Sequence, residues 1–92
     1  MTITLAEAKS LLKITSSDED TSLQKLIDAS TALCADAARM TVEEFEALED
    51  AQSYAALIYA IAYQHEHVED ADHKKLSMDL AAVLEGVRKK VF

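Results

Sequence analysis

The chain has 92 residues, of which 16 are alanine and 11 are leucine, with a single glycine and no proline. Alanine and leucine favour helices and turn-forming residues are scarce, so the composition excludes a sheet protein and predicts an all-α fold. Hydrophobic residues at 50% and charged residues at 28% exclude a wholly disordered chain. The length suits one domain, and we expect residues 1–92 to form a single helical domain.

The net charge of −8 is unevenly distributed along the chain. Residues 43–72 include nine acidic residues and no lysine or arginine, whereas residues 73–92 include five basic residues and two acidic ones. An acidic protein is repelled by phosphate backbones, so DNA binding through bulk charge is disfavoured. An acidic stretch of this kind is most often a solvated face.

Cys34 is the only cysteine, which excludes an intrachain disulfide and a zinc site built from several thiolates. The first ten residues lack the basic and apolar regions of a signal peptide. The longest apolar run, residues 55–63, is nine residues long, whereas a membrane span needs about 20. We therefore expect a soluble cytosolic protein with no membrane partner.

The first two helices have recognisable starts. Thr4 and Glu7 have the spacing of a capping box, in which each side chain binds a free backbone amide of the other residue, and they predict a helix at 5–13. A polar segment rich in serine and aspartate follows and predicts a second helix at 19–38, with acidic residues at the positive end of its dipole. One face of this second helix carries Leu23, Leu26, Ile27, Ser30, Cys34, Ala37 and Ala38.

A second capping box, Thr41 and Glu44, predicts that the chain breaks near Met40 and restarts as a helix at 42–66. No glycine or proline interrupts this segment. One continuous helix and two helices with a kink near Asp50 therefore fit the pattern equally well.

The last helix is predicted at 76–90, after a polar connection at 65–75. Gly86 lies off its apolar face and lowers the helix propensity by about 1 kcal/mol without ending the pattern. Together the segments predict a small bundle of four to five helices with a long central helix. The expected core consists of Leu23, Leu26, Ile27, Ile58, Ile61, Leu80 and Leu84.

The helix predicted at 42–66 is apolar nearly all the way round. Such a helix is either central in its domain or presents a second face to a partner. Tyrosine is favoured at interfaces because it combines a large apolar body with a hydroxyl that tolerates water. The candidate subunit interface on this second face consists of Gln52, Ala56, Tyr59, Ala60 and Tyr63.

Chemical sites are weakly supported. His65, Glu69 and His73 would line up on a continuous helix and could hold a divalent metal, but a solvated connection is the more common meaning of such a segment. Cys34 lies on the apolar face of its helix, where a lone thiol usually behaves as a small hydrophobe. We predict no catalytic residue, no cofactor and no metal site.

The order of segments resembles the head-tail connector family of tailed bacteriophages, also called head-completion or DNA-packaging adaptor proteins. Three motifs carry the resemblance: a short helix of the form T-x-x-E-A-K-x-x-L, an acidic turn followed by x-x-L-x-x-L-I-x-A-A, and an apolar helix that ends in tyrosine and charged residues. Residues 63–66 match the third motif. The first two are matched by Thr4, Glu7, Ala8, Lys9, Leu12, Leu23, Leu26, Ile27 and Ala29.

The resemblance implies a structural role without enzymatic activity. Subunits would form a ring of about a dozen copies beneath the portal protein at the capsid vertex, extend the DNA channel, and dock tail-side connector proteins. DNA would be passing cargo without specific binding, and an acidic channel wall would let it slide. The protein would belong to the virion and, during assembly, to the host cytoplasm.

Two alternatives stay open at this point. The first is a small helical regulator or antitoxin-like module that binds one protein partner as a dimer. The second is a helix-turn-helix DNA-binding protein, which is weaker because no basic recognition helix is visible in the sequence.

Overall fold

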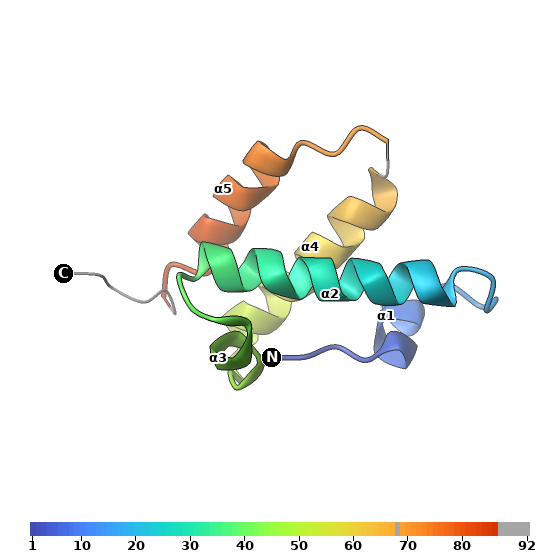
Figure 1. Ribbon diagram of the computed structural model, residues 1–92, viewed down its shortest axis with the longest axis horizontal. Coiled ribbons are helices and arrows are strands. Elements are labelled where there is room, and N and C mark those ends of the chain that lie inside the picture. The colour runs from blue at the N-terminus through green and yellow to red at the C-terminus, as the bar shows by residue number, and fades with distance from the viewer. Residues whose placement is uncertain (68, 87–92) are drawn as a thin grey trace.

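The computed structural model describes residues 1–67 and 69–86 and confirms the all-α fold, with no strand in those ranges. The helices are α1 (Leu5–Leu11), α2 (Asp20–Ala37), α3 (Val42–Glu46), α4 (Ala51–Glu66) and α5 (His73–Val83) (Figure 1).

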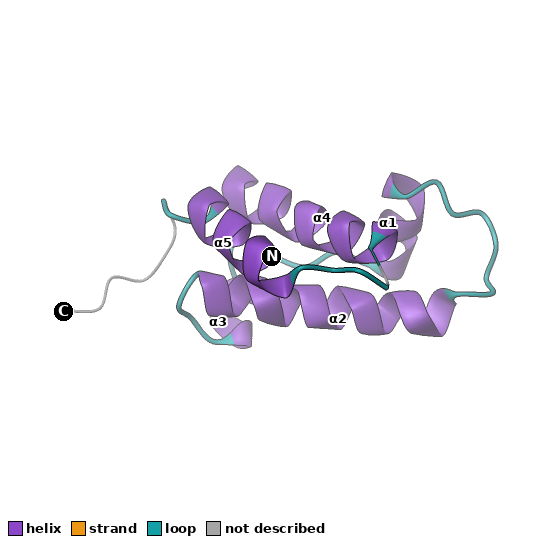
Figure 2. Cartoon of the chain, turned by 90° about the horizontal axis from the view of Figure 1, so that it is seen from above, coloured by secondary structure: helices purple, strands orange, loops and turns teal. Residues whose placement is uncertain are grey.

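Helices α2 and α4 pack against each other at the centre of the bundle. Helix α5 contacts both of them from one side, at the top of Figure 1, whereas α1 and α3 lie below α2 in that view. All four other helices contact α2, which is the longest. Figure 2, seen from above, shows the connection between α1 and α2 as a loop at the end of the bundle opposite the C-terminus.

Both predicted capping boxes are confirmed. The Thr4 Oγ1 atom accepts a hydrogen bond from the Glu7 backbone amide at 3.1 Å, and Thr41 accepts one from Glu44 at the same distance. The N-terminal segment then runs back to α3, where the amino group of Met1 donates to the carbonyl oxygen of Phe45. Burial is the main reason that the pKa of this amino group lies below its ordinary value.

The segment predicted at 42–66 is two helices, so the alternative with a break near Asp50 is correct. Residues 47–50 are not helical, and Asp50 caps α4 by accepting hydrogen bonds from the Ser53 amide at 2.9 Å and the Ser53 hydroxyl at 2.8 Å. Desolvation alone would raise the pKa of Asp50, but these bonds hold it below its ordinary value. A capping carboxylate favours a new helix start over a continuous helix.

Helices α1 and α2 end slightly earlier than predicted, at Leu11 and Ala37. Lys13 and Arg39 both have a φ of 59°, the left-handed conformation that commonly ends helices. After α2, the amide of Met40 binds the carbonyl of Ala35 at 3.0 Å, which completes a Schellman motif. The chain uses a non-glycine residue at both positions.

Helix α5 differs most from its predicted range of 76–90. It begins earlier, because Asp72 caps it by accepting a hydrogen bond from the Lys75 amide at 3.0 Å. It ends at Val83, before Gly86, so the expectation that the helix continues through the glycine is wrong. The part of the prediction that covers residues 87–90 lies outside the described residues.

The core prediction is correct in five of its seven positions: Leu23, Ile27, Ile61, Leu80 and Leu84 are buried. Leu26 and Ile58 are only half-buried, because both line cavities that open beside α4. Other fully buried side chains in the described part of the chain include Phe45, Leu57 and Leu76.

One buried polar contact joins the two central helices. The Gln64 side-chain amide in α4 donates to the Ser30 hydroxyl in α2 at 2.7 Å and to the Ala60 carbonyl at 3.2 Å. Ser30 is fully buried and Gln64 is 8% exposed. The hydrogen bonds offset the cost of removing these polar groups from water.

Candidate functional site

The predicted interface on the second face of α4 is only partly accessible. Ala56 and Ala60 have no exposed surface in the subunit, so a contact on this side of α4 would rest on the other three predicted residues. The sequence pattern left a second face of this helix for a partner, but α2 and α5 both pack against α4. These two alanines therefore belong to the core of the subunit.

The other three predicted interface residues reach the surface close to α5. Tyr59 is 38% exposed and its hydroxyl donates to the carboxylate of Asp79 at 2.8 Å. Tyr63 is half-buried, and its hydroxyl accepts a hydrogen bond from a backbone amide in the loop before α5. Gln52 is exposed, and its side chain lies beside Gly86, where an added Cβ would come within 2.7 Å of its Oε1 atom.

Tyr59, Tyr63 and His67 form a stacked row along the C-terminal end of α4. Tyr59 and Tyr63 have ring centroids 6.2 Å apart, and the Tyr63 and His67 centroids are 4.3 Å apart. Asp79 also accepts a hydrogen bond from Lys75 at 2.9 Å, and this bond together with that from Tyr59 holds the pKa of Asp79 below its ordinary value. Within one subunit, this row fixes α5 against α4.

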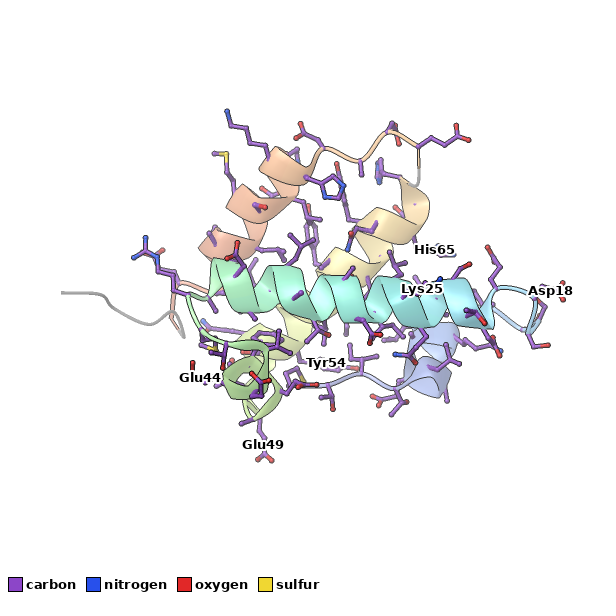
Figure 3. The ribbon with its side chains drawn as sticks, viewed as in Figure 1. Asp18, Lys25, Glu44, Glu49, Tyr54 and His65 are labelled. Atoms are coloured by element: carbon purple, nitrogen blue, oxygen red, sulfur yellow. The ribbon has the colours of Figure 1, made fainter. Side chains whose placement is uncertain are left out.

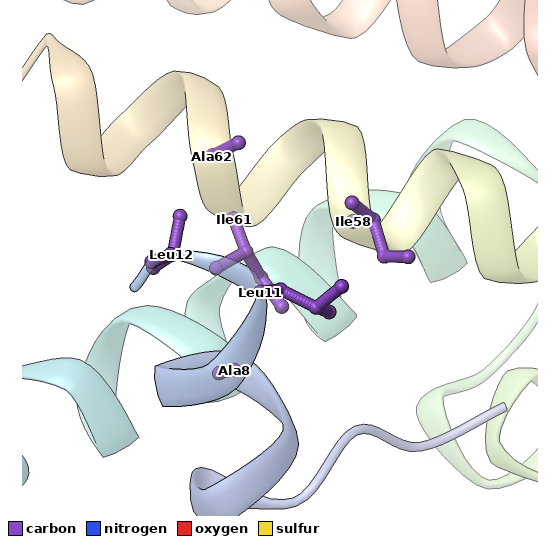
Figure 4. A pocket seen from close by; sticks show the side chains of 6 residues that line it. All are labelled: Ala8, Leu11, Leu12, Ile58, Ile61 and Ala62. Carbon is purple, nitrogen blue, oxygen red and sulfur yellow. The ribbon is translucent and has the colours of Figure 1, made fainter. Parts of the chain in front are cut away.

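The opposite side of α4 carries an apolar hollow, which we call the α1–α4 groove (Figure 4). It has a volume of about 90 Å³ and lies between the end of α1 and the middle of α4. Leu11 on its rim is 46% exposed, and Tyr54, one turn before Ile58 on α4, is 37% exposed. The groove is lined by Ala8, Leu11, Leu12, Ile58, Ile61 and Ala62.

A second cavity of about 200 Å³ opens farther along α4. His65, one turn beyond Ile61 of the groove, forms part of its wall, and Leu26 of α2 supplies an apolar surface. Glu19 and Ser22 add polar groups at its edge. Exposed apolar surface therefore extends beside α4 from Tyr54 to His65, two residues that Figure 3 labels.

The outer face of α5 is a further exposed apolar surface. Met78 is 64% exposed and Val83 is 37% exposed. Met78 has the exposed Lys74 one turn before it and the exposed Ala82 one turn after it. Neither this face nor the α1–α4 groove was predicted, because each depends on how the helices pack.

Acidic groups gather at two ends of the molecule. Figure 3 shows Asp18 at the tip of the turn before α2, and Glu44 and Glu49 around α3. Asp20, close to Asp18 in sequence, is held by the ammonium group of Lys9 at 2.8 Å. The predicted acidic stretch is therefore solvated rather than buried: one part lies around α3, and the rest lies at the end of α4 and in the loop before α5.

The structure also places the residues considered for chemistry. Cys34 has no exposed surface, and burial raises the pKa of its thiol to about 12, so it stays protonated at neutral pH. His65 and His73 lie on different helices, since α4 ends at Glu66 and α5 begins at His73, which breaks the alignment with Glu69. Within residues 1–67 and 69–86, no three histidine, cysteine or acidic residues are grouped to hold a metal ion.

Among the described helices, none combines the length and the apolar character needed to cross a membrane.

Comparison with known families identifies the chain. The family described as phage gp6-like head-tail connector protein matches residues 2–90, a range that includes helices α1 to α5. No curated protein and no solved structure shows a significant match to the chain. Because the match covers nearly the whole sequence, the protein belongs to the phage head-tail connector family and is a structural component of a phage particle.

Proposed function

We propose that the protein is a connector subunit that forms a ring of about a dozen copies under the portal protein. The ring extends the DNA channel and offers a docking surface to tail-side connector proteins. The family match over residues 2–90 carries this proposal. The single domain expected from the sequence is the repeating unit of this ring.

The exposed apolar surfaces support self-association. Leu11 and Tyr54 on one side of the bundle, and Met78 and Val83 on α5, are all more than one third exposed in the isolated subunit. Apolar side chains that gather on a small protein often mark a contact with another protein. An assembly would cover them.

Charge supports the role of DNA as cargo rather than as a ligand. The chain has a net charge of −8, and Glu43, Glu46 and Glu49 around α3 are exposed. If the acidic surface faces the channel, it repels phosphate groups and lets DNA pass without sticking.

Native mass spectrometry and negative-stain imaging of the purified protein at high concentration test this proposal. We expect one closed oligomer with a central hole, and co-purification with the portal protein of the same phage. A dimer that ignores the portal would instead support the regulatory, antitoxin-like alternative. Specific retention of a duplex DNA at physiological salt would contradict the role of DNA as passing cargo.

A further inference from the structure

We propose that the outer face of α5 on one subunit seats Met78 in the α1–α4 groove of a second copy of this chain. This inference rests on the proposed function and adds which two surfaces meet.

The two surfaces lie on opposite sides of the subunit. Helix α5 packs on α2 and α4 from one side, and α1 contacts α2 on the other side (Figures 1 and 2). A contact between two different patches of the same protein is heterologous and generates a ring when the rotation closes. Two identical patches facing each other would give only a dimer.

The groove and the side chain fit in size and polarity. Every residue that lines the groove is alanine, leucine or isoleucine, and its volume is about 90 Å³. One water molecule needs only about 10 to 15 Å³ of a cavity volume of this kind, so the groove has room for the three heavy-atom groups of a methionine side chain beyond its Cβ atom. Methionine is also flexible enough to fill an irregular apolar hollow. At 64% exposure, Met78 is the most exposed of the large hydrophobic residues in the described part of the chain.

Charges beside the two surfaces are complementary. Lys74 is exposed one turn before Met78, and the neighbouring Lys75 is already paired with Asp79. The exposed Glu7 lies one turn before Leu11 on the rim of the groove, whereas the carboxylates of Asp18 and Glu19 lie farther out in the turn before α2. Such pairs at the rim of a contact contribute little to its strength, but they favour one orientation of the partner.

The predicted role of Tyr59 fits the same contact. Tyr59 is hydrogen-bonded to Asp79, the residue after Met78, so its exposed edge borders the α5 face. A partner that covers Met78 would also cover part of this tyrosine. The sequence-based interface and the α5 face are therefore adjacent parts of one surface.

Cysteine cross-linking with two single variants tests the inference directly. Leu11→Cys and Met78→Cys each place a thiol on one of the two surfaces, both at exposed positions. We expect a mixture of the two variants to form covalent dimers under mild oxidation and nothing larger. The double variant should give a ladder of higher oligomers, and each single variant alone should stay uncross-linked. The native Cys34 is buried and does not interfere.

Controls keep each outcome decisive. Met78→Cys mixed with Ala32→Cys, which is exposed on α2, should give no covalent dimer. Leu11→Cys cross-linking to itself would show a symmetric contact and overturn the inference. Met78→Asp should weaken self-association about tenfold or more without unfolding the subunit, because Met78 is exposed. Unchanged association of this variant would also overturn the inference.

The same samples separate this inference from the proposed function. If the wild-type protein forms rings but the mixed cysteine variants do not cross-link, the ring uses other surfaces and only the inference fails. If the wild-type protein forms no oligomer and does not bind the portal, the proposed function fails as well.

Discussion

Arg39 shows how a single backbone conformation limits stability. With a φ of 59°, it adopts a left-handed conformation that costs a residue with a side chain about 1 to 2 kcal/mol. Glycine adopts this conformation without strain, whereas this chain has Ala37, Ala38, Arg39 and Met40 there. The position is therefore a strained substitute for glycine.

We expect Arg39→Gly to stabilise the protein by about 0.5 to 1 kcal/mol, since relief of strain exceeds the extra entropy of the unfolded chain. Urea unfolding followed by circular dichroism measures this change. Asp36→Gly, within the last turn of α2, is the control and should cost about 1 kcal/mol. A destabilised Arg39→Gly variant would show that the arginine side chain makes an essential contact.

Because of Cys34, the stability of the fold depends on pH in alkaline solution. Burial raises the pKa of its thiol from 9.0 to about 12 in the folded protein, so the unfolded chain loses this proton first as the pH rises. The contribution of the neutral thiol is complete below pH 9 and is lost progressively between about pH 9 and 12. At pH 10 the wild type should lose about 1.4 kcal/mol relative to pH 7 from this group.

The Cys34→Ala variant isolates this effect from the other groups that titrate at high pH. Its free energy of unfolding should fall less between pH 7 and pH 10 than that of the wild type. Parallel falls in the two proteins would show that Cys34 reaches water in the folded state.

At the level of helices, Asp50 decides where α4 begins. Asp50→Ala removes both bonds to Ser53 and should cost about 1 kcal/mol, which lowers the melting temperature by about 4 to 8 °C in a domain of this size. Glu49→Ala is the matched control and should change stability by less than about 0.5 kcal/mol.

The cost of Asp50→Ala should also depend on pH. The pKa of Asp50 is held below 3.8 in the folded protein, so the carboxylate stabilises the fold above that value and loses this effect as the pH falls through its folded pKa. The free energies of unfolding of the wild type and the variant should become equal in strongly acidic solution. A constant difference at all pH values would argue that the capping charge is irrelevant.

Local signals could be read from the sequence, whereas long-range packing could not. Thr4, Thr41 and their glutamate partners mark helix starts through bonds within four residues, and both starts are correct. Ala56 is buried because other helices pack on α4, and this packing between segments distant in the chain is not visible in a sequence pattern. The α1–α4 groove likewise exists only because α1 leaves Ile58 half-covered.

For the whole molecule, net charge should oppose assembly. Each subunit carries a net charge of −8, so two subunits repel each other. One pair of opposite charges at the surface stabilises a contact by only about 0 to 1 kcal/mol. Repulsion between like-charged subunits should therefore outweigh any rim pairs at low salt. Raising the salt from 0.1 M to 1 M shortens the screening length from about 10 Å to about 3 Å and should increase the oligomeric fraction.

Sedimentation velocity at the two salt concentrations measures the oligomeric fraction. Dissociation at high salt would show that attraction between opposite charges outweighs the repulsion and holds the subunits together.

The Ser30–Gln64 hydrogen bond helps to set the register in which α4 packs against α2. Alanine-rich helices offer few bulky side chains to oppose sliding past one another, and a shift of α4 by one turn would keep much of its apolar contact with α2. Such a shift would leave the amide of Gln64 and the hydroxyl of Ser30 buried without each other. At about 1 to 3 kcal/mol for each unsatisfied group, this penalty selects one register among alternatives that hydrophobic burial alone would barely distinguish.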